Sequence, residues 1–252
     1  MKRLDGKVGI VTASAGAGIG QATVRKFAQE GASVVVSDIN EKRTKEVADA
    51  LKAEGYEAIG VACDVTNWDQ IQNMVKETLD VFGRIDILVN NAAREIAAAI
   101  TDTTEENWDL VIDTNLKGTF LCTKAVLPTM QKQESGNIVN MASVDGYVGN
   151  PLGECAYCSA KAGIMAFTRA IAAENAGYNI RANAIAPGVV PNPFLKKVYP
   201  EEVLELMEGM SLFNRGARPE EIANIIAFLV SDEASYVTGV IVNASAGIYW
   251  SQ

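Results

Sequence analysis

Short apolar runs rich in valine and isoleucine alternate along the chain with longer segments in which apolar residues recur at helical spacing. The short runs occupy residues 8–11, 33–36, 58–61, 85–89, 137–140, 180–185 and 240–242. The longer segments include residues 21–29, 41–52, 68–81, 157–175 and 219–229. Continuous β-branched runs are typical of strands that are buried on both faces, so the pattern predicts a parallel sheet covered by helices.

Seven such strands with helices between them predict a doubly wound α/β fold, with right-handed crossovers and helices on both faces of a seven-stranded parallel sheet. The 252 residues contain no internal repeat, no low-complexity segment and no linker. We therefore expect a single domain that spans residues 1–252.

Residues 191–215 interrupt this alternation. They contain three prolines, followed by an apolar stretch at helical spacing that includes Val203, Leu206, Met207 and Met210. Long connections of this kind in compact domains are commonly lids or binding loops. We expect a lid over the substrate, and an ordinary pair of surface helices is the alternative.

The composition excludes several classes of protein. Lysine and arginine number 22 against 31 acidic residues, a net charge of −9, whereas proteins that follow a nucleic-acid backbone carry the opposite sign. No apolar run approaches the roughly 20 residues that span a bilayer. Four cysteines, Cys63, Cys122, Cys155 and Cys158, are too few for a disulfide framework in a chain of this length. We expect a cytoplasmic protein with reduced thiols and with neither a nucleic-acid nor a membrane partner.

The chain contains no histidine. This excludes Ser-His-Asp and Cys-His hydrolases, histidine-ligated metal sites and an imidazole general base. Cys155 and Cys158 match a C-x-x-C motif, but no second pair accompanies them. We interpret them as small hydrophobic residues and predict no metal site.

A glycine-rich turn at residues 13–20 follows the first predicted strand and precedes a helix. Glycines let the backbone approach a pyrophosphate, and the helix N-terminus presents free N–H groups to it. The next strand leads to Asp38, 18 residues after Gly20, where a carboxylate can bind the adenosine ribose hydroxyls. Because the same charge would repel a 2′-phosphate, the sequence favours NAD over NADP.

Ser143 closes the region of the fifth predicted strand, three residues after Asn140, and Tyr157 and Lys161 follow with a spacing of four residues between them. On a helix this spacing places both side chains on one face. A tyrosine is a poor base near neutrality because its ordinary pKa is about 10. An ammonium one turn away and the positive ring of an oxidised nicotinamide would favour the phenolate, so we expect a lowered pKa for Tyr157. An exposed helical pair is the alternative.

Together these motifs resemble the short-chain dehydrogenase/reductase family over essentially the whole chain. The resemblance implies a Rossmann-type oxidoreductase domain with a nicotinamide cofactor. The residues that it assigns to the cofactor are Thr12, Ser14, Gly18, Ile19, Gly20, Asp38, Asp64, Val65, Asn91, Ala92, Tyr157, Lys161, Pro187, Gly188, Val190 and Asn192.

The same resemblance implies four catalytic residues. Tyr157 exchanges the alcohol proton, Ser143 hydrogen-bonds the substrate oxygen, and Lys161 lowers the pKa of Tyr157 and binds the nicotinamide ribose. Asn115 holds a water that links Lys161 to solvent. Besides Ser143, the residues expected to contact substrate are Arg94, Asp145, Val189 and Phe194.

The sequence departs from the family pattern at five positions. Ala13, Ala93 and Ala246 stand where glycine is usual, and Ser245 stands where aspartate is usual. Asn192 stands where a threonine commonly binds the nicotinamide carboxamide. Each added methyl lies where the backbone should approach a ligand, so weaker cofactor binding is expected.

The expected function is NAD-dependent interconversion of a secondary alcohol and a ketone, on an apolar or cyclic small molecule or a hydroxyacyl thioester. One alternative is a 3-oxoacyl-thioester reductase, which Asp38 and the acidic surface disfavour. The other is a non-catalytic nucleotide-binding subunit, which the four intact catalytic residues disfavour. Relatives pair the long helix at 157–175 in dimers and tetramers, so a homotetramer is expected.

Overall fold

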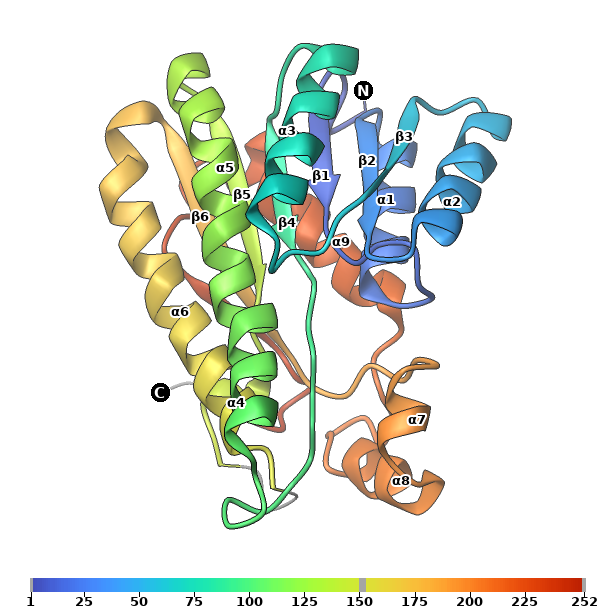
Figure 1. Ribbon diagram of the computed structural model, residues 1–252, viewed down its shortest axis with the longest axis vertical. Helices are drawn as coiled ribbons and strands as arrows, with labels where there is room; N and C mark the ends of the chain where they lie inside the picture. Colours follow the sequence, from blue (N-terminus) through green and yellow to red (C-terminus); the bar gives the residue numbers. More distant parts are fainter. Residues whose placement is uncertain (1, 150–152, 251–252) are drawn as a thin grey trace.

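The strands found in the described residues, 2–149 and 153–250 of the computed structural model, form one sheet between two helical layers (Figure 1). The sheet has seven parallel strands in the order β3-β2-β1-β4-β5-β6-β7. Their bounds are β1 (Val8–Val11), β2 (Ser33–Asp38), β3 (Ala58–Ala62), β4 (Ile87–Asn90), β5 (Gly136–Met141), β6 (Ile180–Pro187) and β7 (Ile241–Ala244). This arrangement confirms the predicted doubly wound fold.

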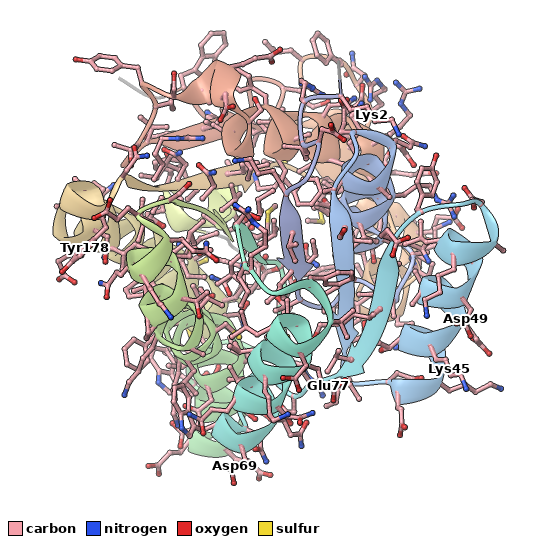
Figure 2. All side chains as sticks on the ribbon, turned by 90° about the horizontal axis from the view of Figure 1, so that it is seen from above. Lys2, Lys45, Asp49, Asp69, Glu77 and Tyr178 are labelled. Carbon is pink, nitrogen blue, oxygen red and sulfur yellow. The ribbon has the colours of Figure 1, made fainter. Side chains whose placement is uncertain are left out.

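Helices cover both faces of the sheet. One face is covered by α1 (Ile19–Gln29), α2 (Glu41–Ala53) and α9 (Pro219–Val230). The other face is covered by α3 (Trp68–Phe82), α5 (Gly118–Gln133) and α6 (Cys155–Asn175), and α4 (Glu105–Ile112) leads into α5. Charged side chains such as Lys45 and Asp49 of α2 and Asp69 and Glu77 of α3 lie on the outer surface (Figure 2).

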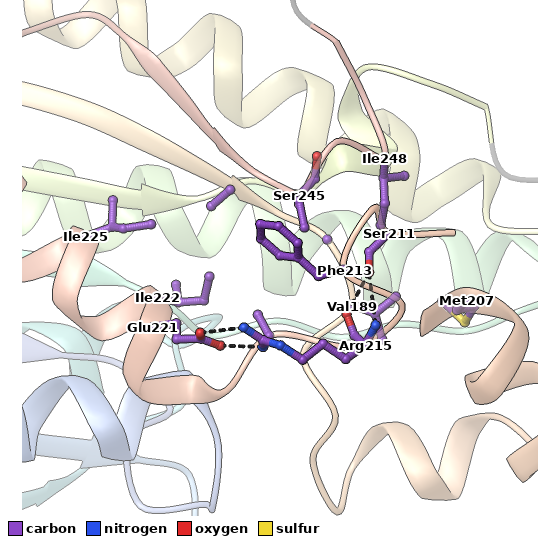
Figure 3. A pocket seen from close by; sticks show the side chains of 14 residues that line it. Val189, Met207, Ser211, Phe213, Arg215, Glu221, Ile222, Ile225, Ser245 and Ile248 are labelled. Atoms are coloured by element: carbon purple, nitrogen blue, oxygen red, sulfur yellow. Dashed lines mark hydrogen bonds and ion pairs between the residues drawn. The ribbon is translucent and has the colours of Figure 1, made fainter. Parts of the chain in front are cut away.

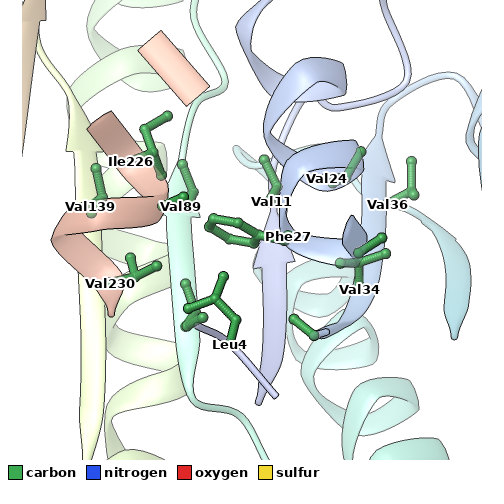
Figure 4. Close-up of a cluster of buried hydrophobic side chains, with 14 of the residues drawn as sticks. Leu4, Val11, Val24, Phe27, Val34, Val36, Val89, Val139, Ile226 and Val230 are labelled. Atoms are coloured by element: carbon green, nitrogen blue, oxygen red, sulfur yellow. The ribbon is translucent and has the colours of Figure 1, made fainter. Parts of the chain in front are cut away.

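Successive strand residues belong to opposite cores. Val34 and Val36 of β2 pack with Phe27 of α1, whereas Val35 between them packs with Ile71 of α3. Figure 4 shows Phe27 among the strand valines of the first core. Strand side chains alternate between the two faces, so coverage of both faces requires apolar residues at every position. This is the physical reason for the unbroken apolar runs in the sequence.

Local capping fixes where the helices around the site begin and end. The Asn40 side chain accepts a hydrogen bond from the Arg43 amide at 2.9 Å at the start of α2, and Asn67 does the same for Gln70 at 3.1 Å at the start of α3. Gly83 ends α3 in the left-handed region with φ 73°. Caps of this kind contribute about 1 kcal/mol each.

The segment at 191–215 contains α7 (Leu195–Val198) and α8 (Glu201–Gly209). Both lie beyond the carboxyl ends of the strands, apart from the two helical layers (Figure 1). We call residues 191–215 the lid, and that they cover a substrate stays a prediction.

Candidate active site

A cavity of about 720 Å³ lies at the carboxyl ends of the strands, below the lid. Small-molecule sites usually have volumes of about 300–1,000 Å³. The predicted site residues that line it are Gly18, Ile19, Gly20, Asp38, Asn91, Arg94, Ser143, Asp145, Tyr157, Lys161, Pro187, Gly188, Val189, Val190, Asn192 and Phe194.

The glycine turn leaves room for a ligand at one end of this cavity. A Cβ on Gly16 would meet no atom within 4 Å, and one on Gly18 would meet only Asn192, at 3.9 Å. A Cβ on Gly20, in contrast, would lie 2.5 Å from the Ala13 carbonyl oxygen, so Gly20 is required by the turn itself. Open backbone at the N-terminus of α1 fits a pyrophosphate.

Two of the alanines that replace usual glycines have a strained backbone. Ala13 and Ala246 both have φ 50°, in the left-handed region. Residues with a Cβ adopt this conformation at a cost of about 1–2 kcal/mol. The departure from glycine at these positions therefore reduces the stability of the turns.

This strain predicts that Ala13→Gly leaves the free energy of unfolding unchanged or raises it by up to about 1 kcal/mol, because relief of strain offsets the extra entropy of the unfolded chain. Ala50→Gly, on the exposed face of α2, is the matched control and should cost about 0.5–1 kcal/mol. Urea unfolding of both variants measures the difference, and equal losses would contradict the strain at Ala13.

Asp38 lies in the cavity wall with a basic partner that the sequence motifs did not indicate. Its carboxylate accepts hydrogen bonds from the amides of Ala15 (3.3 Å) and Asn40 (3.1 Å), and the Arg43 guanidinium lies 3.5 Å from Oδ1. Arg43 also lines the cavity. The only sequence signal for it was a basic residue in the first turn of the helix that follows Asp38.

Some expected cofactor residues hold the strand ends together below the cavity wall. The Thr12 hydroxyl accepts hydrogen bonds from the amides of Asn91 (2.9 Å) and Ala92 (3.0 Å), which joins β1 to β4. The Ser14 hydroxyl donates to the Val11 carbonyl at 2.8 Å. Thr12, Ser14 and Ala92 are not among the lining residues in the described part of the chain.

Asp64 and Val65, expected at the adenine ring, also lie outside the cavity lining in the described part of the chain. The Asp64 carboxylate accepts hydrogen bonds from the Thr66 amide at 2.9 Å and the Thr66 hydroxyl at 2.7 Å. This turn leads into α3. Because neither residue lines the cavity, their contact with the adenine ring stays a prediction.

Helix α6, which carries Tyr157 and Lys161, is fixed by a chain of buried amides. The Asn90 side chain of β4 donates to Asn140 of β5 at 2.8 Å, and Asn140 donates to the Thr168 hydroxyl of α6 at 2.9 Å. Buried polar groups of this kind are costly when unpaired, so the chain of bonds sets the position of α6 relative to the strand ends.

Ser143, Tyr157 and Lys161 meet near the end of β5, three strands along the sheet from Asp38 at the end of β2. Ser143 and Tyr157 share a side-chain hydrogen bond, and the Ser143 hydroxyl donates to Asp145 at 2.9 Å. Lys161 Nζ donates to the Met141 carbonyl at 2.6 Å and lies 5.3 Å from the centroid of the Tyr157 ring. The predicted hydroxyl, phenol and ammonium groups are thus brought together.

The pKa of Tyr157 was expected to be lowered by Lys161, but in this arrangement of side chains it is raised. Loss of hydration raises the pKa of Tyr157 well above its ordinary value, and the charges of Glu95 and Asp145 add to the rise. Burial likewise lowers the pKa of Lys161 to about 8, against the opposing effect of the same two carboxylates. The protein environment therefore favours the neutral phenol as a proton donor.

Asn115 lies in a π-helical turn (Asp113–Lys117) between α4 and α5. Its side-chain nitrogen donates to the carbonyls of Arg94 (2.7 Å) and Val111 (2.8 Å), which fixes the amide. Its buried Oδ1 has no hydrogen-bond partner among the described residues. A π-turn and an unpaired buried acceptor are both typical of functional positions, and the acceptor fits the expected water.

Asn192 lines the cavity, but its amide holds the start of the lid. The side-chain nitrogen donates to the Val190 carbonyl at 2.9 Å, and Oδ1 accepts from the amides of Phe194 (2.9 Å) and Leu195 (3.1 Å). To bind the nicotinamide carboxamide as expected, the Asn192 amide would have to give up hydrogen bonds that fix the backbone of residues 190–195.

The lid contributes an apolar roof to the cavity, formed by Phe194, Leu195, Leu206, Met207 and Met210. A smaller cavity of about 160 Å³ adjoins it and shares Gly188, Val189, Met207 and Ile248 with the larger one. There the Arg215 guanidinium makes two 2.8 Å hydrogen bonds with Glu221, which tie the end of the lid to α9 (Figure 3).

Within the described residues, no group of three or more histidine, cysteine, aspartate or glutamate side chains could hold a metal ion. No helix of the described chain is both long enough and apolar enough to cross a membrane.

Comparison with known proteins gives the same family as the motifs. A family model described as enoyl-(acyl carrier protein) reductase matches residues 13–249. A 3-oxoacyl-[acyl-carrier-protein] reductase of Thermotoga maritima is 44% identical over 250 residues, covering 98% of this chain and 99% of that protein.

Two further relatives carry different names. The (2S)-[(R)-hydroxy(phenyl)methyl]succinyl-CoA dehydrogenase subunit BbsD of Thauera aromatica is 38% identical, covering 97% of each protein. The crystal structure of gox2181 superimposes with a TM-score of 0.94 at 36% identity, covering 98% of this chain and 96% of that one.

A parallel α/β sheet with a glycine turn, and a Ser-Tyr-Lys set on the same cavity, define an oxidoreductase that uses a nicotinamide cofactor. The chain belongs to the short-chain dehydrogenase/reductase family.

Proposed function

We propose that the protein interconverts a secondary alcohol and a ketone with NAD as the hydride carrier. The observation that carries the proposal is that one cavity holds Asp38 and the glycine turn, at the ends of β2 and β1, together with Ser143, Tyr157 and Lys161 near the end of β5. That distribution fits an extended dinucleotide with its reactive ring beside the phenol.

The residues of the chain supply binding and the proton. Ser143 donates a hydrogen bond to the substrate oxygen, which stabilises negative charge as it develops there. In ketone reduction Tyr157 gives its proton to that oxygen, and in alcohol oxidation it takes the proton back. Lys161 holds positive charge beside the phenol and toward the cofactor ribose. The cofactor, when bound, supplies or accepts the hydride.

The apolar roof of the cavity favours an apolar substrate. The names of the relatives favour a hydroxyacyl or 3-oxoacyl thioester as its chemical class. The relative in Thermotoga maritima is named for a 3-oxoacyl thioester, so reduction of that group is the second candidate function. Arg94 lies in the cavity wall, where it would pair with a phosphate or carboxylate of such a substrate.

An assay of the purified chain with NAD(H) and NADP(H) tests the proposal. The panel should contain cyclic alcohols, hydroxy acids and both oxidation states of a short-chain hydroxyacyl-CoA. Turnover of any secondary alcohol or ketone supports the reaction class. The relative rates on the simple alcohols and on the acyl-CoA thioester decide between the two candidate functions. A chain that binds NADH without any turnover would instead be a nucleotide-binding subunit.

We expect NAD to give at least tenfold higher kcat/KM than NADP, a difference of about 1.4 kcal/mol. The reason is the Asp38 carboxylate at the ribose end of the cavity. Asp38→Ala should raise kcat/KM with NADP, because it removes the repulsion and releases Arg43 from its 3.5 Å contact with that carboxylate. Parallel kinetics with both cofactors measure the ratio.

The matched control is the double variant Asp38→Ala/Arg43→Ala, which should lose the gain with NADP. Equal use of both cofactors by the wild type would contradict the role of Asp38. A gain that persists without Arg43 would contradict the role of the guanidinium.

We expect a homotetramer in the cytoplasm, formed in part by α6, whose alanines permit close approach of helices. Light scattering should give about four times the 26.9 kDa of one chain, and a mass equal to one chain at micromolar concentration would reject the tetramer.

A further inference from the structure

Three side chains outside the Ser-Tyr-Lys set meet where the lid touches the rest of the molecule. Glu95 lies in the connection from β4 to α4, Glu154 directly precedes α6, and Tyr199 directly follows α7 of the lid. The Tyr199 hydroxyl makes hydrogen bonds with a carboxyl oxygen of both glutamates. Glu154 is 2% exposed and Tyr199 6%, so the contact is shielded from water.

The hydrogen-bond pattern favours a proton on the carboxyl pair. A phenol has one proton to donate, and an ionised carboxylate can only accept. A second proton on one of the glutamates, donated to the phenol or to the other carboxyl, gives each of the two contacts a hydrogen of its own. Without it, lone pairs would face each other in a buried site.

Burial and the acidic groups around the pair act in the same direction. The titratable groups that face it are Asp145, Tyr157 and Lys161, and among them Lys161 opposes the rise because its positive charge lowers the pKa of Glu95. Burial, together with the neighbouring carboxylates, raises the pKa of Glu154 to about 8, and burial raises the pKa of Glu95 as well. A pair of this kind titrates as a unit and keeps one proton at neutral pH.

The contact joins the lid to the segments that carry the candidate catalytic groups. The backbone next to Glu154 is itself held, because the Ala98 amide donates to the Gly153 carbonyl at 2.7 Å. Tyr157 follows Glu154 within the first turn of α6, and Glu95 lines the cavity. Release of Tyr199 would free α7 and the apolar roof from the rim of the site.

We propose that Glu95, Glu154 and Tyr199 are positioning residues that hold the lid over the candidate active site through one shared proton. The attachment does not depend on the reaction, and only its effect on turnover rests on the proposed function.

The direction of the pH dependence follows from the raised pKa. The closed lid binds a proton that the open lid, with its carboxyls in water, releases at about the ordinary pKa near 4.5. Closure is therefore most favourable below that value and weakens as the pH rises, up to tenfold per pH unit, until about pH 8. Above that pH the dependence ends, because both forms are ionised.

Amide hydrogen exchange of the lid tests the proposal without any substrate. Exchange of residues 195–210, corrected for the intrinsic rate at each pH, should rise in the wild type between pH 5 and pH 8. Glu154→Gln keeps a donor but cannot ionise, so its lid exchange should be independent of pH. Tyr199→Phe should give an open lid at every pH.

Glu205→Gln, on the exposed face of α8, is the matched control and should follow the wild type. Exchange of β2 in each variant reports whether the core is folded. Infrared spectra should contain a protonated carboxyl band that Glu154→Gln removes. The proposal is overturned if wild-type exchange is flat with pH, or if Glu154→Gln keeps the wild-type slope.

Turnover gives a separate result. Tyr199→Phe should raise KM for the alcohol or ketone about tenfold while kcat and the NADH dissociation constant stay within about twofold, because the lid touches substrate and not the proton donor. An unchanged KM would overturn the positioning role. An inactive wild type would instead overturn the proposed function and leave the exchange test valid.

Discussion

Replacing Tyr157 by phenylalanine is expected to lower kcat by at least about 10²–10³, the usual range for loss of a positioned acid or base. The ring and its packing remain, but the hydroxyl that bonds Ser143 is lost. The chain has no histidine to replace it. Steady-state kinetics give kcat, and NADH fluorescence titration should give a nearly unchanged cofactor affinity.

Tyr178→Phe, at an exposed tyrosine that follows α6, is the matched control and should have wild-type kcat. Retention of more than about a tenth of the wild-type turnover by Tyr157→Phe would mean that another group moves the proton. The acidic groups whose charges act on Tyr157 are Glu95, Asp145 and Glu154, so the same assay on an amide variant of each in the Tyr157→Phe background identifies the substitute.

The raised pKa of Tyr157 bears on the direction of the reaction. Because the carboxylates of Glu95 and Asp145 and the loss of hydration all favour the neutral phenol, the protein holds a proton ready for donation. Ketone reduction uses that proton directly. Alcohol oxidation needs the phenolate, and the positive charges that stabilise it are the ammonium of Lys161 and the ring of an oxidised cofactor.

The strands were predictable because burial on both faces leaves a simple signature. Every predicted strand begins within two residues of the observed one, and β1 agrees at both ends. The segment from α4 to α5 was not singled out by periodicity. A π-turn shifts the register of its side chains, and α5 contains Pro128, so the apolar positions do not follow one helical period.

The candidate site was predictable where its residues follow strand ends and fall in local motifs, as Asp38, Ser143 and Tyr157 do. Residues that meet only in the folded chain gave no such signal. Tyr199 lies 104 residues from Glu95 and 45 from Glu154 in the sequence. Their shared burial depends on a tertiary arrangement that no spacing encodes. The same holds for the rise in the pKa of Tyr157, which comes from its own burial and from the charges of Glu95, Asp145 and Glu154.

Replacing Lys161 by methionine is expected to lower kcat by about 10² and to weaken NADH binding, in contrast to Tyr157→Phe. Methionine keeps the length and the apolar stem of the side chain but removes the charge beside the phenol. The ionisation near pH 8 that burial gives Lys161 should also disappear from the pH profile. Kinetics between pH 6 and pH 10 and NADH titration measure both effects.

The stability of Lys161→Met provides an independent readout. In the wild type the folded state lowers the pKa of Lys161 from its ordinary 10.5 to about 8, so the buried ammonium is destabilising below pH 8. The variant should therefore be at least as stable as the wild type at pH 7, and its advantage should shrink as the pH rises from 8 to 10.5. A variant that is less stable at pH 7 would mean that the bond from Nζ to the Met141 carbonyl outweighs the cost of burying the charge. Lys161 would then be a structural anchor of α6 as much as a partner of Tyr157.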